Sequence, residues 1–299
     1  MAFHQRRESN IGRCCETRQV NLPLNKIDSH LHVWAHDPEK YPYRPGAGEP
    51  DARGDAEFLI ELQQEAGISG ALIVQPIHHG FDHRYVTDTL GRWPDRFIGM
   101  ALVNPSASDP LAELRRLVEE DGYRGVRLNP ALWPDGESMD GPIGDALMGY
   151  CEEAGIVAGF LIEPRHFHEV DALCARHPGT AVIIDHFGRV KPTEAGKADV
   201  DALMGLSRHR NTYVKVSGFP ISSELDWPYR DMSSIVRRLI DSYGAERLMF
   251  ATDFPHIVAQ CGYARAWQIA DEVEPSLSET DREWLLGGTV SKLFNHWGG

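Results

Sequence analysis

Long apolar runs and positive charge are both scarce in this 299-residue chain. It contains no stretch of about 18 consecutive apolar residues, the length that a membrane-spanning helix needs. The 44 acidic residues outnumber the 30 basic ones and give a net charge of -14. That balance argues against nucleic acid and against an anionic membrane surface as partners, although a local arginine cluster can still bind an anionic substrate.

Cysteine is scarce as well, with five residues and no C-x-x-C pair. Such a set is typical of reduced, structural thiols in a cytoplasmic protein. The N-terminal region is polar and lacks the apolar stretch of a secretory signal. We therefore expect a cytoplasmic protein with a loosely ordered extension over residues 1–24 and a single domain over residues 25–299.

Short β-branched runs alternate with amphipathic segments along most of the chain. The strand-like runs are Ile27–Val33, Gly70–Val74, Phe97–Val103, Gly125–Leu128, Ile156–Ile162, Ala181–Asp185, Thr212–Ser217 and Arg247–Ala251. Helical spacing occurs at Ala56–Glu65, Leu111–Glu119, Ile143–Glu152, Phe167–Arg176, Asp199–Ser207 and Ser233–Tyr243. Eight such strands predict a parallel sheet closed into a (β/α)₈ TIM barrel.

Two further patterns refine this prediction. Apolar residues near helical spacing in Glu279–Trp297 predict C-terminal closing helices, and Gly67, Gly155 and Gly244 are placed to cap helices in a left-handed conformation. The first strand is not followed by a G-x-G-x-x-G loop. That absence disfavours the alternative of an open, doubly wound nucleotide-binding sheet.

Polar side chains follow several of the predicted strands, at the barrel end where catalytic residues gather. His30 and His32 lie two residues apart, so their side chains share one face of the first strand. Asp253 follows the eighth strand, which neighbours the first when the barrel closes, and His186 follows the sixth. We predict that these four residues are catalytic; the alternative is that the two neighbouring histidines form a hydrogen-bonded structural pair.

Two imidazoles and a carboxylate on adjacent strands also suit a divalent transition metal. The predicted ligands are His30, His32 and Asp253, holding a single ion such as Zn²⁺ or Mn²⁺. A metal-free site is the alternative.

Two arginines follow the fourth and sixth strands. Arg127 and Arg189 are predicted to bind a substrate carboxylate through paired hydrogen bonds. The alternative is that they form salt bridges with Asp185 or Glu163 at the barrel mouth.

Three further residues are less constrained by the pattern. Gln75 follows the second strand, and Tyr43 lies in a proline-rich first loop that could cover the site, so both are predicted to bind substrate. Lys215 on the seventh strand could face either the barrel interior or the helices.

Five motifs occur in order along the chain: Ile-Asp-Ser-His-Leu-His-Val-Trp, Ile-Val-Gln-Pro, Gly-Val-Arg-Leu-Asn, Ile-Asp-His-Phe-Gly-Arg and Phe-Ala-Thr-Asp-Phe-Pro. Together they resemble the amidohydrolase superfamily. The closer resemblance is to its amidohydrolase-related branch, which holds 2-pyrone-4,6-dicarboxylate lactonases, sugar-acid lactonases and related decarboxylases. The resemblance covers Asn25 to the C-terminus. It implies a distorted TIM barrel that hydrolyses its substrate with an activated water.

The resemblance also implies residue roles. Asp253 matches the strand-eight aspartate that takes a proton from water, and His186 matches the strand-six histidine. Arg127 and Arg189 match arginines that hold an acidic substrate in the pyrone-lactonase subgroup.

The chain departs from the metal-dependent family pattern at strands four and five. Strand four carries Arg127 in place of a bridging residue, and strand five ends in Glu163, with His166 beyond it. This argues against a bridged two-metal centre and leaves a single metal ion or a metal-free site.

The predicted function is a lactonase-like hydrolase that opens a lactone or ester ring. Its small-molecule substrate is expected to be carboxylated or polyhydroxylated, and a homo-oligomer is compatible with the sequence. Two alternatives stay open: a non-oxidative decarboxylase or hydratase on the same barrel, and a catalytically silent barrel that binds a small acid.

Overall fold

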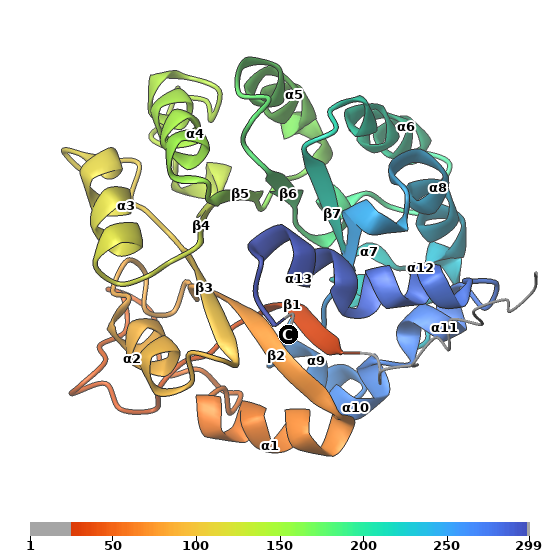
Figure 1. Cartoon of the computed structure of the whole chain (residues 1–299), viewed down its shortest axis with the longest axis horizontal. Coiled ribbons are helices and arrows are strands. Elements are labelled where there is room, and N and C mark those ends of the chain that lie inside the picture. The colour runs from red at the N-terminus through yellow and green to blue at the C-terminus, as the bar shows by residue number, and fades with distance from the viewer. Residues whose placement is uncertain (1–24, 298–299) are drawn as a thin grey trace, which may run out of the picture.

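The computed structural model describes residues 25–297, in which parallel strands wind into a barrel with the helices outside (Figure 1). The strands are β1 (Lys26–Leu31), β2 (Ile68–Val74), β3 (Phe97–Ala101), β4 (Gly125–Leu128), β5 (Val157–Phe160), β6 (Val182–Ile184), β7 (Thr212–Val216) and β8 (Leu248–Phe250). The helices of the repeat are α1 (Ala56–Ala66), α2 (Arg84–Arg92), α3 (Pro110–Glu119), α4 (Pro142–Ala154), α5 (Phe167–Arg176), α6 (Lys197–Gly205), α7 (Phe219–Ser222) and α8 (Ser233–Tyr243). After β8 come α9 (His256–Gln260), α10 (Tyr263–Ala266), α11 (Ile269–Val273), α12 (Glu279–Glu283), a π-helical turn (Trp284–Gly288) and α13 (Thr289–Phe294).

The strands pair in sequence order from β1 to β8, all in parallel. The seam between β8 and β1 is closed by a single bridge between Leu31 and Phe254 and by two backbone hydrogen bonds beside it. The eight strands therefore form the predicted (β/α)₈ barrel, distorted at this seam.

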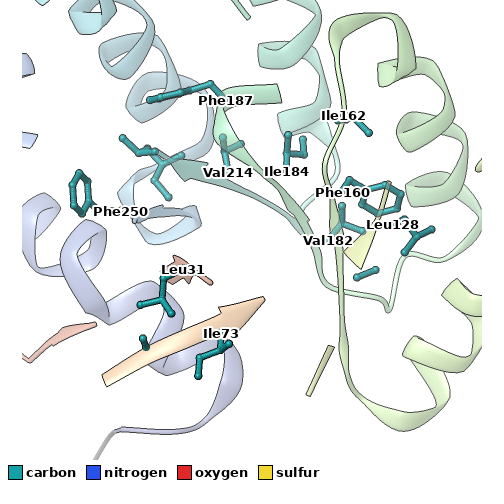
Figure 2. Packing of buried hydrophobic residues seen from close by; sticks show 14 of the residues in the cluster. Leu31, Ile73, Leu128, Phe160, Ile162, Val182, Ile184, Phe187, Val214 and Phe250 are labelled. Carbon is teal, nitrogen blue, oxygen red and sulfur yellow. The ribbon is translucent and has the colours of Figure 1, made fainter. Parts of the chain in front are cut away.

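The strands separate two apolar clusters. One lies between the barrel and the helices and includes Leu31, Ile73, Leu128, Phe160 and Phe250 (Figure 2). The other is made by the alternate side chains of the strands and fills the barrel interior; its members include Ile27, Leu72, Val74, Ile98, Met100, Val157, Ile183 and Met249. Burial on both faces explains why these strands read as continuous apolar runs.

The C-terminal helices close the N-terminal end of the barrel. Val290 and Phe294 of α13 belong to the interior cluster, and α13 lies across the barrel in Figure 1. The Trp297 indole donates a hydrogen bond to the carbonyl oxygen of Arg96, just before β3, at 2.9 Å. This apolar plug leaves the opposite end, where the polar residues gather, open to solvent.

Local capping fixes several helix ends. Asp55 and Asp109 each accept a hydrogen bond from a backbone amide in the first turn of α1 and α3. Gly67 and Gly155 adopt the predicted left-handed conformation after α1 and α4. Gly244 does not: its φ of 78° is accompanied by a ψ of 150°, because the chain turns directly into a short 3₁₀ turn before β8.

Helix α2 escaped the sequence pattern, as did the short helices α7, α9, α10 and α11. Helix α2 buries only Tyr85, Val86 and Thr89, and the Thr89 hydroxyl donates to the carbonyl oxygen of Tyr85 within the helix. A buried threonine whose hydroxyl bonds within the helix in this way breaks the apolar periodicity from which the longer helices were predicted. The expected extension over residues 1–24 lies outside the described residues. Among residues 25–297, no helix is long and apolar enough to cross a membrane.

Candidate active site

Strand β1 presents two histidines to the barrel interior through an irregularity in its pairing. Ile27 faces the interior, whereas Leu31, four residues later, packs outside against the helices. The register with β2 shifts between Asp28 and Leu31, which exchanges the two faces of the strand. His30 and His32 therefore both point inward and are buried.

Asp253 lies beside this pair, directly after β8. Its backbone amide donates to the His30 carbonyl oxygen at 3.0 Å, and its φ of 61° lies in the left-handed region. This conformation is strained for a residue other than glycine, and such strained residues are concentrated at functional sites. The side chain is 13% exposed, and its Oδ1 atom has no hydrogen-bond partner.

A left-handed turn after β6 brings in the third imidazole. All four residues from His186 to Arg189 have φ between 51° and 58°. Nδ1 of His186 lies 2.9 Å from the Ser217 hydroxyl, and its ring centroid lies 4.5 Å from that of His30. The turn thus places His186 at the bottom of the site and Arg189 at its wall.

The four predicted catalytic residues therefore converge. Nε2 of His30 lies 3.3 Å from Nε2 of His32, and these two atoms lie 3.7 and 3.6 Å from Oδ1 of Asp253. Ligands around one zinc ion at about 2 Å in tetrahedral geometry are roughly 3.3 Å apart. The three atoms, with the unpaired carboxylate oxygen among them, are compatible with a single divalent ion.

Strand β5 adds no imidazole to this group. Leu161 lines the pocket beyond β5. His166 turns away: its Nδ1 accepts a hydrogen bond from the backbone amide of Glu163 at 3.3 Å. Among the described residues the centre therefore lacks the strand-five histidine that is typical of the metal-dependent family pattern.

Burial dominates the electrostatics of the imidazoles. Desolvation, followed by the nearby Arg127 guanidinium, lowers the pKa of His32 to about 3. Desolvation also lowers the pKa of His30 and of His186. For Asp253 burial acts in the opposite sense, but the imidazoles of His186, His30 and His32 outweigh it and lower its pKa to about 2. At neutral pH the site therefore holds neutral histidines around an ionised carboxylate.

Below the histidines lies a buried ion pair. Nζ of Lys215 on β7 lies 2.9 Å from Oδ1 of Asp185, and neither side chain is more than 1% exposed. Lys215 thus faces the barrel interior. Nζ also lies 2.8 Å from Nδ1 of His30, so the pair is in direct contact with the catalytic residues.

The two arginines lie on one wall of the site. Arg127 is 5% exposed, and its Nη1 lies 3.9 Å from Oδ2 of Asp185. Nη1 of Arg189 lies 3.7 Å from Oε1 of Glu163. Nε of each guanidinium is buried without a hydrogen-bond partner. Both salt bridges considered from the sequence are present, but at distances that leave donors free for an anion.

These residues open into a cavity of about 430 Å³ at the C-terminal end of the barrel. Its floor and one wall carry His32, His186, Asp253, Arg127 and Arg189. The rest of the lining is mainly apolar or aromatic, with Trp34, Pro76, Ile77, Leu161, Pro220, Ile221 and Ile257. Such a site suits a small molecule with one polar or charged end and a compact ring.

Gln75 and Tyr43 have other partners. The buried Gln75 amide donates to the carbonyl oxygens of Gly80 and Asp82 at 3.1 and 2.9 Å. The Tyr43 hydroxyl donates to the Ala35 carbonyl oxygen at 2.8 Å. Neither side chain lines the main cavity; Gln75 holds the loop after β2, and Tyr43 lines a neighbouring hollow.

Several residues of the site were not predicted from the sequence. The Lys215–Asp185 pair could not be placed, because the facing of a strand residue depends on the barrel's register. Trp34 and His256 line the cavity with their rings 5.8 Å apart. Each closely follows a predicted catalytic residue, and that proximity is the signal that could have identified them.

Comparison with known proteins agrees with the barrel. The profile of the family described as Amidohydrolase matches residues 27–295. The chain is 27% identical to a 4-sulfomuconolactone hydrolase from Hydrogenophaga intermedia over 284 residues, which are 91% of this chain and 89% of the relative. It is 24% identical to an L-fucono-1,5-lactonase from Burkholderia ambifaria over 250 residues, 81% of this chain and 85% of the relative.

A solved structure has the same fold. A protein from Pseudomonas putida, provisionally named a 2-pyrone-4,6-dicarboxylic acid hydrolase, superposes with a TM-score of 0.79 at 26% identity. The superposition covers 93% of this chain and all of the other.

Proposed function

Because the chain belongs to the amidohydrolase family, as its five motifs indicate, we propose that it is a hydrolase that opens a small acidic lactone. Its relatives include proteins named for the hydrolysis of a sulfomuconolactone and of a fuconolactone. One observation carries the proposal: Oδ1 of Asp253 is a buried, ionised carboxylate oxygen without a hydrogen-bond partner, set among three imidazoles.

Asp253 is the general base. With a pKa of about 2 it is ionised at neutral pH, and its free Oδ1 can accept a proton from a water molecule. The water attacks the lactone carbonyl, and the tetrahedral intermediate collapses with cleavage of the ring C–O bond. The proton on Asp253 then passes to the departing alkoxide, which yields a hydroxy acid.

His186 and Arg127, which both line the cavity, stabilise the oxyanion that forms on the carbonyl. His30 and His186 have ring centroids 4.5 Å apart, and the Arg127 guanidinium lies close enough to lower the pKa of His32. Fixed donors in a desolvated site stabilise developing charge without reorganisation. A Zn²⁺ or Mn²⁺ ion held by His30, His32 and Asp253 would polarise the carbonyl at the same place.

Arg127 and Arg189 bind the acidic group of the substrate. They form one wall of the cavity, and their buried Nε atoms lack partners. The apolar rim around Trp34 and Ile257 packs the ring and holds its carbonyl over Asp253. A cavity with a cationic wall and an apolar rim fits a carboxylated lactone better than a neutral one.

The test is a panel of lactones assayed with the wild-type protein and with Asp253→Asn. The panel contains a sulfonated butenolide, a pyrone dicarboxylate and a sugar-acid 1,5-lactone, and opening is followed by release of acid. We expect turnover of an acidic member, and a loss of kcat of about 10²- to 10⁴-fold in Asp253→Asn with binding kept.

Asp226→Asn, an exposed carboxylate in the loop after α7, is the matched control and should keep full activity. Release of CO₂ from carboxylated substrates, measured in the same samples, would favour the decarboxylase alternative. An Asp253→Asn variant that keeps most of its turnover would refute the assignment of the base.

A further inference from the structure

The buried Lys215 has no role in the hydrolysis described so far. It is 0% exposed and stands in the barrel interior directly beneath the catalytic residues. A lysine is almost never fully buried unless it is paired, because desolvation of its charge is costly. Its partners therefore indicate why it is there.

Lys215 makes two close contacts. Nζ lies 2.9 Å from Oδ1 of Asp185 and 2.8 Å from Nδ1 of His30. The same Asp185 oxygen lies 3.4 Å from Nδ1 of His30, so the three groups form a closed triangle. Of the two groups near Nδ1, the lysine is the nearer by 0.6 Å.

The hydrogen-bond chemistry of the triangle fixes one tautomer of His30. An ammonium group has three donors and no acceptor, so Nδ1 of His30 must accept the hydrogen bond from Lys215. A proton on Nδ1, directed at Asp185, would instead face the ammonium at 2.8 Å. A neutral imidazole carries one proton, and in His30 it is therefore on Nε2.

His32 has the opposite arrangement. Its Nδ1 lies 2.8 Å from the Val74 carbonyl oxygen, which only accepts, so Nδ1 of His32 carries the proton and Nε2 has a lone pair. The two Nε2 atoms lie 3.3 Å apart, one a donor and the other an acceptor. The single N–H of the pair, that of His30, is thus directed at Nε2 of His32, with Oδ1 of Asp253 3.7 Å from the same nitrogen.

We propose that Lys215, held by Asp185, is a positioning residue that fixes His30 as the Nε2–H tautomer, so that the buried His30 directs its only donor at Nε2 of His32 and Oδ1 of Asp253 and holds these two groups in place. The inference rests on the proposed lactone hydrolysis for the role of Asp253 as the general base. It has a second consequence: an Nε2 that carries a proton cannot ligate a metal ion, so Lys215 opposes metal binding at His30.

The proposal is tested by heteronuclear NMR of the histidine imidazole nitrogens in the free protein. The His30 signals are assigned by their loss in His30→Asn. In the wild type we expect Nε2 of His30 to be protonated and Nδ1 to be unprotonated. In Lys215→Met we expect the proton to move to Nδ1, where Asp185 accepts it.

Two functional readouts accompany the spectra. Zn²⁺ affinity, measured by titration calorimetry with the metal alone, should rise about tenfold or more in Lys215→Met. The kcat for lactone opening should fall about 10- to 100-fold while KM stays within about threefold. Lys197→Met, an exposed lysine at the start of α6, should change none of these values.

Lys215→Met leaves Asp185 buried without its counter-ion, so the double variant Lys215→Met/Asp185→Asn removes both charges and protects against misfolding. It too should lose the fixed Nε2–H tautomer. The proposal would be overturned by any of three results: protonation of His30 on Nδ1 in the wild type, the same tautomer in both variants as in the wild type, or equal Zn²⁺ affinity in the wild type and Lys215→Met. The spectra need no substrate, so they test the tautomer independently of the activity. If His30 shows the expected tautomer but the protein opens no lactone, the proposed function is refuted and the proposal about Lys215 is not.

Discussion

Asp28 and Thr252 join the first and last strands of the barrel through two hydrogen bonds. The Thr252 hydroxyl donates to Oδ2 of Asp28 at 2.5 Å, and its amide donates to Oδ1 at 3.0 Å. Tyr263 donates to the same carboxylate at 3.0 Å. This contact lies at the seam where the sheet has one bridge, and it is two residues from His30 and one from Asp253. The seam therefore sets the distance between the catalytic base and the imidazoles.

Removal of the Thr252 hydroxyl should loosen this seam. In Thr252→Val one oxygen of the buried Asp28 loses its nearest donor, at a cost of about 1–3 kcal/mol in the free energy of unfolding. Because Asp253 is the next residue, we also expect a clear fall in kcat. Urea unfolding and steady-state kinetics measure the two effects.

Thr180→Val is the matched control. Its hydroxyl donates to the Met148 carbonyl oxygen at 3.0 Å and is equally buried, but it lies before β6, away from the mouth. It should lose stability and keep kcat. If both variants lowered kcat alike, the seam would have no special part in catalysis.

Arg127→Met should raise KM for an acidic lactone far more than for a neutral one. A hydrogen bond to a charged group contributes about 1.5–3 kcal/mol, which corresponds to roughly 10- to 100-fold in KM. The neutral analogue lacks the anion and should change little. Arg165→Met, an exposed arginine that pairs with Glu163, serves as the control. Equal effects on both substrates would rule out the anion-binding role.

The pH dependence should lack the ionisation of an ordinary histidine. The pKa of His32 is about 3 and that of Asp253 about 2, so neither group titrates between roughly pH 4.5 and 8. Since kcat/KM reports the free enzyme, we expect no limb from these two groups over that range, whereas Asp28 at the seam, whose pKa burial raises to about 6, can add one. An acid limb with a midpoint near 6.5 that persists in Asp28→Asn would show that a catalytic histidine is not held neutral.

The same shifts predict acid sensitivity of the fold. A histidine whose pKa is depressed in the folded state binds a proton more readily when unfolded, so its contribution to stability is full above the unfolded value of 6.5. That contribution falls as the pH drops from 6.5 toward 3. Asp253 acts in the same direction at lower pH, because its depressed pKa favours the fold only while it is ionised. Thermal unfolding as a function of pH separates this loss from the kinetic profile.

The sequence predicted the barrel because its strands are buried on both faces and therefore read as apolar runs. It predicted the convergence of His30, His32, His186 and Asp253 because parallel strands end at one mouth. It could not reveal the irregularity in β1, which exchanges the two faces of that strand within a few residues. The same limit applied to Lys215, whose facing follows from the register of β7.

Loop residues were harder to predict than strand residues. Arg189 reaches the cavity only because the residues before it adopt left-handed conformations, which no periodicity encodes. Gln75 was expected to bind substrate because it ends a strand, but its amide satisfies the carbonyl groups of its own loop. Hydrogen bonding within a loop depends on its path, and the path is a property of the folded chain.

Gly218 provides a final test of how tightly His186 is held. Its φ is +68°, and a Cβ atom there would lie 2.8 Å from Cβ and 2.9 Å from Nδ1 of His186. Gly67, at the end of α1, has the same φ of +68° with no atom within 4 Å of such a Cβ. Gly67→Ala should therefore cost only the left-handed strain, about 1–2 kcal/mol of stability, and leave kcat unchanged. Gly218→Ala adds a collision with a catalytic imidazole and should lower kcat at least tenfold as well. Calorimetric unfolding measures the stability of the two variants, and steady-state kinetics measures their kcat. Equal kcat values in the two variants would mean that the His186 ring can move without loss of catalysis.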